Sequence, residues 1–372
     1  MRRARSTVPT ERRPIQTKMS QNVRDASSTS ASADPVTILN AGLYVLSGCS
    51  QPILMTICKD AGLGDPIAQV YMLFYALGPA LVILPLLGQK QQSWPSKSIF
   101  WKTAGIAIFD IVATCINYIG AALAGPTIFS IVYSSVTVWT AVYSQLLLSR
   151  SMDRWQWAAV LTVFGGLTLT ATDSLRLGVS VVKGLLMVVF GSAMHALTYV
   201  VSESVMTRGD ERLSVQQNCA IQSNVACLFF VVWQLVYTLP RYDEAIGEPM
   251  KQAGTDPIKA LVILSLFGLS NLIHSVAFFS TLLHFPGGAT SAGVMKGLQA
   301  VLVFLFTHWA FCGRTGGDEM CFSRSKFLSL VTVVGGVIWY GSATQNSRKR
   351  RSRAANGGYE QIDNAIELEP ML

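Results

Sequence analysis

The stretch Val160-Leu-Thr-Val-Phe-Gly-Gly166 returns later in the chain, with small changes, as Leu330-Val-Thr-Val-Val-Gly-Gly336. When the two stretches are aligned, the threonine, the valine after it and both glycines coincide. Each stretch lies inside an apolar run, and an arginine, Arg154 or Arg324, precedes it at the same distance. A motif that returns in the same context indicates an internal duplication. We therefore expect a chain built from two related halves.

Apolar runs of membrane-spanning length fill most of the chain around these stretches. Of its 372 residues 51% are hydrophobic and 13% charged, whereas soluble domains carry about 25% charged residues. A bilayer core about 30 Å thick needs roughly 20 residues of helix, and barrel strands would be shorter and alternating. The sequence thus predicts an all-α integral membrane protein. Ten runs qualify as spans: 36–58, 66–87, 103–123, 127–148, 155–172, 180–206, 215–239, 257–283, 287–310 and 326–343.

The ten spans divide into two five-helix halves, residues 36–174 and residues 178–343. Pro126 precedes the fourth span as Pro286 precedes the ninth, which supports this division. An odd number of spans inverts the second half relative to the first. Inverted repeats are the usual architecture of alternating-access carriers, whose substrate site lies near the midplane between the halves.

Both ends of the chain are polar and basic. Lys and Arg concentrate there and in the 88–102 loop, so the positive-inside rule places both tails in the cytosol. The N-tail, residues 1–35, has the composition of a disordered segment and shares features with organelle transit peptides. The C-tail, residues 344–372, starts with a basic cluster at Arg348–Arg351 that suits anionic lipid. It ends with two candidate sorting signals, at Tyr359 with Ile362 and at Met371 with Leu372.

Glycines and cysteines predict contacts at the edges of the two halves. Small residues let helices approach closely in lipid, so we expect the fifth and tenth spans to pack on each other or on a second copy in a homodimer. The glycines concerned are Gly165, Gly166, Gly335 and Gly336. Cys312 and Cys321 flank a polar loop on the non-cytosolic face, where an oxidising lumen would favour a disulfide. Two free thiols are the alternative.

Charged residues inside spans are costly and usually serve function. Asp110 in the third span shares one helix face with Thr114 and Asn117, and we expect this face to look into the bundle. Lys296 lies near mid-depth of the ninth span, with Gln299 on the same face. A buried ammonium needs an anionic partner, and Asp110 is the nearest by depth. The two residues either bind and couple a solute or form a permanent tie between the halves.

The other polar candidates lie in the fourth, sixth and eighth spans. Glu203 is close to the cytosolic end of its span, where a carboxylate can reach water. His195, and His274 with Asn271 one turn before it, are proton-coupling candidates because histidine titrates near neutral pH. Hydrogen-bonded structural roles are the alternative for both histidines. The stripe formed by Ser130, Ser134 and Thr137 either lines a cavity or packs tightly.

Several stretches resemble a known family. Phe129–Arg150, followed by Arg154-Trp-Gln-Trp, resembles the EamA-type half repeat of the drug/metabolite transporter superfamily. The third span around Asp110 resembles the nucleotide-sugar-transporter-like solute carriers and the group related to the chloroquine-resistance transporter. Ala292–Val301 is similar to the stretch where sugar-phosphate and nucleotide-sugar carriers place a phosphate-facing lysine, and Lys296 falls on that lysine. Sugar-phosphate carriers also have a basic residue in the fourth span, which this chain lacks.

The resemblance implies a secondary transporter that moves a small polar metabolite across an endomembrane, driven by protons or by exchange. A nucleotide-sugar or sugar-phosphate antiporter of Golgi or plastid type is the narrower alternative. A non-transporting scaffold or a lipid enzyme is the alternative from another class. The sequence contains no P-loop, HExxH, Gly-x-Ser-x-Gly or paired zinc-site cysteines, so we expect no enzyme activity, cofactor or metal.

Partners and location follow from the same features. We expect a small solute, membrane lipid and, through the C-tail signals, sorting adaptors as partners. The basic residues lie beside apolar runs, which favours lipid contact over nucleic acid. The expected location is a lysosomal, vacuolar or Golgi membrane, with a plastid membrane and the plasma membrane as alternatives.

Overall fold

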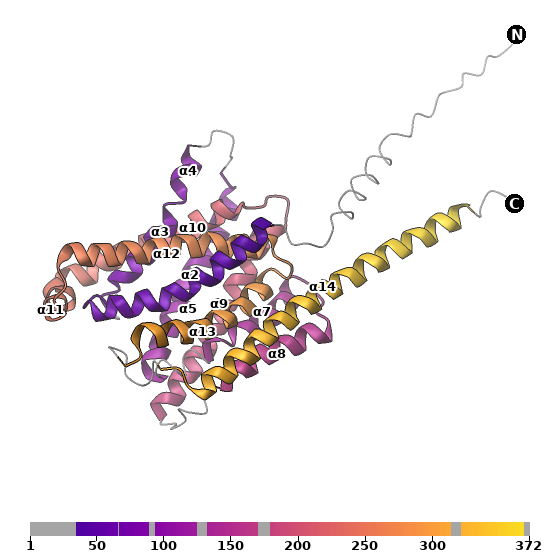
Figure 1. The fold of residues 1–372 in the computed structure, drawn as a ribbon. Coiled ribbons are helices and arrows are strands. Elements are labelled where there is room, and N and C mark those ends of the chain that lie inside the picture. Colours follow the sequence, from indigo (N-terminus) through magenta and orange to yellow (C-terminus); the bar gives the residue numbers. More distant parts are fainter. Residues whose placement is uncertain are drawn as a thin grey trace, which may run out of the picture.

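The computed structural model describes residues 35–65, 67–88, 94–124, 132–169, 179–313 and 321–367, the last stretch from residue 351 onward as backbone alone. Every regular element in these ranges is a helix. The helices lie side by side in one bundle, and α11 lies at the opposite end of it from the point where α14 leaves (Figure 1). The expected all-α class is confirmed.

The helices follow the order of the expected halves. The first half contains α2 (Pro35–Asp60), α3 (Val70–Ala80), α4 (Ile83–Leu87), α5 (Lys97–Ala124), α7 (Val136–Leu147) and α8 (Arg154–Thr168). The second half contains α9 (Val179–Thr207), α10 (Val215–Trp233), α12 (Pro257–His284), α13 (Ala289–Phe311) and α14 (Arg324–Glu367). Between α10 and α12 the chain remains helical through η2 (Gln234–Thr238), η3 (Leu239–Arg241), η4 (Asp243–Gly247) and α11 (Glu248–Gln252).

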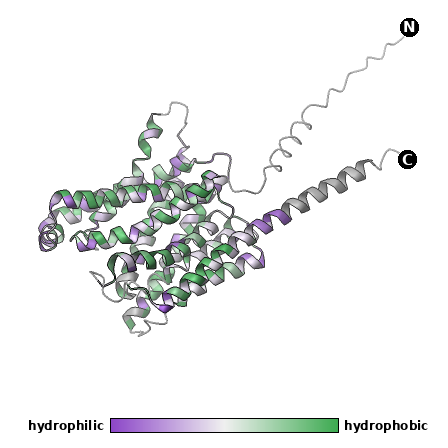
Figure 2. Cartoon of the chain, viewed as in Figure 1, coloured by the Kyte–Doolittle hydropathy of each residue, from purple (hydrophilic) through white to green (hydrophobic). Residues whose placement is uncertain are grey.

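Eight of the described helical segments are long and apolar enough to cross a membrane. Apolar residues cover the bundle along its length, and polar residues gather towards its ends (Figure 2). The expected spans 127–148 and 155–172 contain α7 and α8, which have 12 and 15 residues. Residues 125–131 and 170–178, next to these helices, lie outside the described part. A multi-pass membrane protein is confirmed, and the count of ten spans stays a prediction.

Helices of the two halves pack in matching combinations. α5 packs on α9 as α12 packs on α2; α7 packs on α9 as α13 packs on α2; α10 packs on α5 as α3 packs on α12. The contacts α3–α10, α7–α13 and α8–α14 each join helices in equivalent positions of the two halves. Helices of each half therefore pack against helices of the other half, and residues from both halves meet in the middle of the bundle.

The repeated motif lies where α8 crosses α14. A Cβ atom on Gly166 would meet Thr332–Val333, and one on Gly336 would meet Thr162–Val163. Each of these glycines thus faces the Thr-Val pair of the other copy. This reciprocal contact requires the two helices to run antiparallel.

The first glycine of each motif has a different environment from the second. A Cβ atom on Gly165 or Gly335 would find no other atom within 4 Å. The close approach of α8 and α14 therefore depends on the second glycine of each pair, and the first faces outward. The homodimer expected through these helices stays a prediction.

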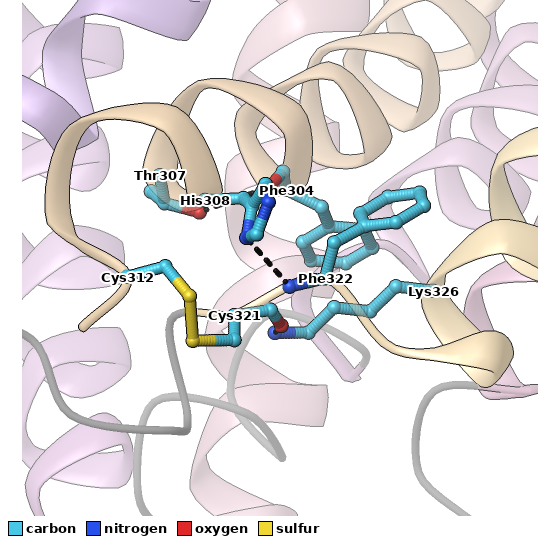
Figure 3. Close-up of a disulfide and its surroundings, with 7 residues drawn as sticks. All are labelled: Phe304, Thr307, His308, Cys312, Cys321, Phe322 and Lys326. Atoms are coloured by element: carbon cyan, nitrogen blue, oxygen red, sulfur yellow. Dashed lines mark hydrogen bonds between the residues drawn. A yellow bond between two sulfur atoms is a disulfide. The ribbon is translucent and has the colours of Figure 1, made fainter.

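The connection between α13 and α14 is closed by a disulfide between Cys312 and Cys321 (Figure 3), with Cα atoms 4.7 Å apart. His308 Nδ1 accepts a hydrogen bond of 3.1 Å from the Phe322 backbone N–H. Lys326 Nζ donates a hydrogen bond of 2.7 Å to the Cys321 carbonyl. These contacts fasten the start of α14 to the end of α13.

α14 continues as a helix past residue 343, the expected end of the tenth span, to Glu367 (Figure 1). Arg350 Nη1 lies 3.6 Å from Asp153 Oδ2 where α14 leaves the bundle, and we call this the exit end. Tyr359 and Ile362 lie on the backbone-only part of α14. Of the other predicted features, Met371, Leu372, Ser130 and residues 1–34 lie outside the described residues.

Candidate functional site

A carboxylate and an imidazole meet where α5 packs on α9. Asp110 Oδ1 lies 2.8 Å from His195 Nδ1 and accepts a hydrogen bond of 2.9 Å from Thr198 Oγ1. Thr198 lies one turn after His195, so one stretch of α9 supplies both contacts. The two helices run antiparallel. The acidic face predicted for the third span is thus directed at the second half of the chain.

The Asp110 carboxylate opens towards the inside of the bundle. Its side chain is 37% exposed. Four apolar side chains of the same part of α5 are exposed: Ile108, Phe109, Val112 and Ile119. With 3.6 residues per turn, Asp110 points to the opposite side of the helix from all of these except Phe109, which is about 100° away. Its carboxylate is therefore directed towards the neighbouring helices of the bundle, and we call the region around it on this side of α5 the chamber.

Tyrosines line the chamber. Tyr75, Tyr133 and Tyr199 each interact electrostatically with Asp110. The ring of His195 lies 5.9 Å from that of Tyr133 and 5.0 Å from that of Tyr199, measured between centroids. These residues come from α3, from the turn before α7 and from α9. The wall therefore combines flat apolar rings with hydroxyl groups from both halves.

Lys296 of α13 brings a cation to the same space. It interacts electrostatically with Asp110 and with Cys49, yet the two charges are not within ion-pair distance among the described residues. Asp110 as the nearest anionic partner of Lys296 by depth stays a prediction, and a permanent tie between the two is not formed as a direct ion pair in the described part of the chain. His195 lies on a helix packed against α5, whereas α13 packs on α2 and α7. The ammonium is left available to an anionic group of a solute.

His274 and Asn271 belong to a second network, where α12 packs on α2. His274 Nδ1 lies 3.1 Å from Ser47 Oγ, and its ring stacks on Tyr44 with centroids 4.9 Å apart. Gln51 Nε2 donates a hydrogen bond of 2.8 Å to Asn271 Oδ1. His274 is 6% and Asn271 2% exposed. Asn271 Nδ2 also donates a hydrogen bond of 2.6 Å to the Tyr75 carbonyl of α3. This network contains no carboxylate, is buried and is occupied by protein partners, so it holds α12 against α2 and α3.

Other predicted polar residues also lie in helix contacts. Gln299 Nε2 donates to the Tyr44 carbonyl at 2.8 Å, and Thr137 Oγ1 donates to the Gly293 carbonyl at 2.9 Å. Ser134 is buried. Of the two readings of the serine and threonine stripe, the described residues therefore follow the packing one.

The remaining members of the polar face of α5 lie beside α9. Asn117 is buried against Gly191, at a distance that leaves no room for a Cβ atom there. Thr114 is half-buried one turn from Asp110. The face expected to look into the bundle does so, with Asp110 as its most accessible member.

Glu203 does not reach water, contrary to expectation. Its side chain is fully buried, its Oε1 pairs with the Arg150 guanidinium, and its Oε2 accepts a hydrogen bond of 2.7 Å from the Ala289 N–H. The expectation considered depth alone. It could not include Arg150 or the start of α13, which enclose the carboxylate.

Sequence reasoning missed several residues of these sites. Thr198 could have been found from its place one turn after His195. Tyr44 could have been found from the polar face that it shares with Ser47 and Gln51 on α2. Arg150 gave no such signal, because an arginine between two spans is first read as a topology marker.

One group of described residues has the side-chain types of a metal site. A ring nitrogen of His308 and the sulfur atoms of Cys312 and Cys321 lie within 4.8 Å of one another. The two sulfurs are bonded to each other in the disulfide, and a metal would need them as thiolates. The group therefore serves as a covalent clip here.

Comparison with known proteins gives a family for the first half. Residues 45–172 match the EamA-like transporter family. No curated protein matches the chain. One solved crystal structure, 12% identical, aligns with a TM-score of 0.59 over 80% of this chain and 98% of that chain. At that identity the likeness shows the fold alone.

Proposed function

We propose that this multi-pass membrane protein, which carries an EamA-like transporter domain at residues 45–172, is a secondary transporter of a small polar metabolite. The observation that carries the proposal is the chamber. Asp110 is 37% exposed on the helix face turned away from lipid, and groups from both halves surround it. A charge kept accessible in the middle of a membrane bundle is typical of a solute pathway.

Alternating access is supported by the relation between the halves. The matching helix pairs and the reciprocal contacts of Gly166 and Gly336 are what a two-fold axis between two inverted five-helix repeats would produce. In such carriers the halves rock around a fixed central site. The proposal also includes ten spans, two repeats at residues 36–174 and 178–343, and the chamber between these repeats.

The chamber supplies two kinds of recognition. Lys296 can bind an anionic group of the solute. The Asp110–His195 pair can hold or release a proton. Tyr199 lies beside it on α9, and Tyr133 and Lys296 approach it from other segments. Because this carboxylate and imidazole can share a proton within hydrogen-bond distance, proton coupling through the pair is the driving mechanism that the site supports best. Binding energy that differs between the two open states then drives the conformational cycle.

A nucleotide-sugar or sugar-phosphate antiporter is the second candidate, since Lys296 lies where such carriers place a phosphate-facing lysine. The fourth span, 127–148, offers no second cation, because it contains no lysine or arginine. A metabolite without a phosphate group therefore suits the chamber better. The basic cluster just beyond the exit end supports cytosolic tails. The proposed endomembrane location is supported by the two candidate sorting signals of the C-tail, at Tyr359 with Ile362 and at Met371 with Leu372.

Flux into liposomes tests the function. The purified protein is reconstituted, and uptake is compared for nucleotide sugars, sugar phosphates, amino acids and organic cations. We expect competition within one solute class and loss of that flux in Lys296→Ala. Lys251→Ala is the matched control, since Lys251 pairs with Glu248 on the surface and the variant should keep full flux. A protein that moves none of these solutes but turns over a lipid would instead be an enzyme.

A further inference from the structure

Glu203 forms a closed charged contact between the halves at the exit end. Arg150 lies in the connection between α7 and α8 of the first half, and Glu203 and Ala289 lie in α9 and at the start of α13 of the second. The carboxylate is fully buried. One side chain thus ties together three helices that border the chamber.

The turn before α13 is shaped around this carboxylate. Gly288 has φ 52° and ψ −122°, a backbone conformation that side chains disfavour. A Cβ atom on Gly288 would collide with the carboxyl group of Glu203. The Ala289 N–H, one of the free donors at a helix start, is thereby brought to 2.7 Å from Oε2. The site is therefore built for an acid at position 203 and not merely tolerant of one.

A second arginine closes the same end. Arg208, at the end of α9, donates from Nη1 to the Leu147 carbonyl at 2.9 Å and from Nη2 to the Leu148 carbonyl. These carbonyls are among those left free at the end of α7. With Arg150 and Glu203, this contact seals the gap between α7, α9 and α13.

We propose that Glu203 and Arg150 are the latch of a gate that closes the chamber towards the exit end. The inference rests on the proposed function, because a latch has a role only in a protein that opens. An ion pair suits this role. The Arg150 side chain is 37% exposed, whereas the Glu203 side chain is fully buried. A buried charge gains little net stability from pairing, and the Glu203 carboxylate becomes hydrated when the gate opens, so the closed and open states stay close in free energy. Glu203 is then a gating residue and not a solute ligand.

One hydrogen-bond donor of the latch has no partner in the closed state. Arg150 Nη1 is buried with no hydrogen-bond partner among the described residues. A buried donor of this kind is uncommon and calls for an explanation. Opening to water would satisfy it, which lowers the free-energy difference between the closed and open states.

Thiol labelling tests the latch without a substrate. Cys49 is 2% exposed on α2, and its sulfur lies 3.7 Å from the Gln299 carbonyl of α13. Full-length protein in vesicles keeps Cys49 as its sole free thiol, with serine at the other free cysteines and with the disulfide retained. A charged, membrane-impermeant thiosulfonate is added on the exit side. The free cysteines replaced are Cys58, Cys115, Cys219 and Cys227.

We expect Glu203→Gln and Arg150→Gln each to raise the Cys49 labelling rate by at least about tenfold, because the population shifts to the open state. Arg150→Lys, which keeps the charge, should lie between these variants and the parent. Arg154→Gln is the control. Arg154 is four residues after Arg150 and lies over the Trp155 ring, away from Glu203, so the labelling rate of this variant should equal that of the parent.

The result that would overturn the latch is a normal labelling rate in both Glu203→Gln and Arg150→Gln together with a lowered melting temperature, which is the signature of a purely structural ion pair. If one of these variants fails to fold, the other and Arg150→Lys still give the comparison. The parent's liposome flux is scored separately. If the variants are labelled faster than the parent but the parent moves no solute, the result would support the gate and count against the transport function.

Discussion

Each of two equivalent helix pairs of the bundle contains a histidine, on opposite members of the pair, and the two histidines have different partners. His195 lies on α9 against α5, and His274 lies on α12 against α2, which are equivalent helix pairs of the two halves. Each imidazole also lies beside a tyrosine ring, at 5.0 Å from Tyr199 or 4.9 Å from Tyr44. The partner of His195 is the Asp110 carboxylate, whereas that of His274 is a hydroxyl group.

The difference separates a working contact from a structural one. The charged pair is partly accessible, with His195 at 16% and Asp110 at 37% exposure, and the neutral network around His274 is buried. A duplicated chain thus keeps the same helix packing twice but places a carboxylate beside a histidine in only one of the two equivalent helix pairs, α5 with α9. Function in this fold would follow from that asymmetry, and substitutions on the two sides should therefore have different effects.

The largest effect is expected for Asp110→Asn. The variant keeps the shape of the side chain but removes the charge that His195 and Thr198 bind. A hydrogen bond to a charged group contributes about 1.5–3 kcal/mol, so flux into liposomes should fall by about 10- to 100-fold while the protein still reaches the membrane. Asn271→Ala, in the corresponding neutral network, should lower the melting temperature and keep flux. Unchanged flux in Asp110→Asn would remove the carboxylate from the mechanism.

The next effect concerns the pH profile. His195→Gln should flatten the dependence of flux on pH, because it removes the imidazole that lies 2.8 Å from the Asp110 carboxylate and leaves an amide that cannot exchange a proton with it. His274→Gln should retain the parent's profile, because its ring contacts Ser47 and Tyr44 inside the packing between α2 and α12. Flux is measured with equal pH on both sides and with an imposed gradient. Equal flattening in both variants would mean that the two histidines form one coupled system.

How far the sequence predicted this asymmetry can be judged from single residues. The all-α class and the acidic face of the third span follow from length, apolarity and a period of 3.6 residues, which act within one helix. Which residue pairs with Asp110 depends on which helix packs against α5, and depth along the membrane normal cannot decide that. Depth pairs Lys296 with Asp110 because it gives the level of each residue in the membrane. It does not say on which side of the bundle a residue lies.

The prediction that the Glu203 carboxylate reaches water was wrong for a related reason. Its depth near a span end favoured exposure, but Arg150 and the Gly288 turn are brought to it by segments far away in sequence. Gly166 and Gly336 were foreseen as packing residues from their type, whereas the outward direction of Gly165 and Gly335 depends on the crossing of α8 and α14. Chemistry that depends on one helix could be predicted, and chemistry that depends on a neighbour could not.

Where the halves are alike, substitutions should have similar effects. Gly166→Leu and Gly336→Leu each force a side chain against the Thr-Val pair of the other motif. Overpacking of this kind typically costs about 1–3 kcal/mol, so both variants should melt at lower temperature by a similar amount. Gly165→Leu has open space and should melt like the parent. A loss confined to one of the first two variants would argue against equivalent roles for the two motifs.

The smallest effects are expected from the hydroxyl partners of the two histidine sites. Thr198→Ala removes the hydrogen bond to Asp110, and Ser47→Ala removes the one to His274. Each hydrogen bond contributes about 0.5–1.5 kcal/mol, but the loss should appear in different measurements. Thr198→Ala should lower flux several-fold with little change in melting temperature, since it acts on an accessible carboxylate. Ser47→Ala should lower the melting temperature and leave flux intact, since it acts on a buried helix contact. If both variants changed flux equally, the neutral network would be part of the solute pathway, and the division between a working and a structural histidine would be wrong.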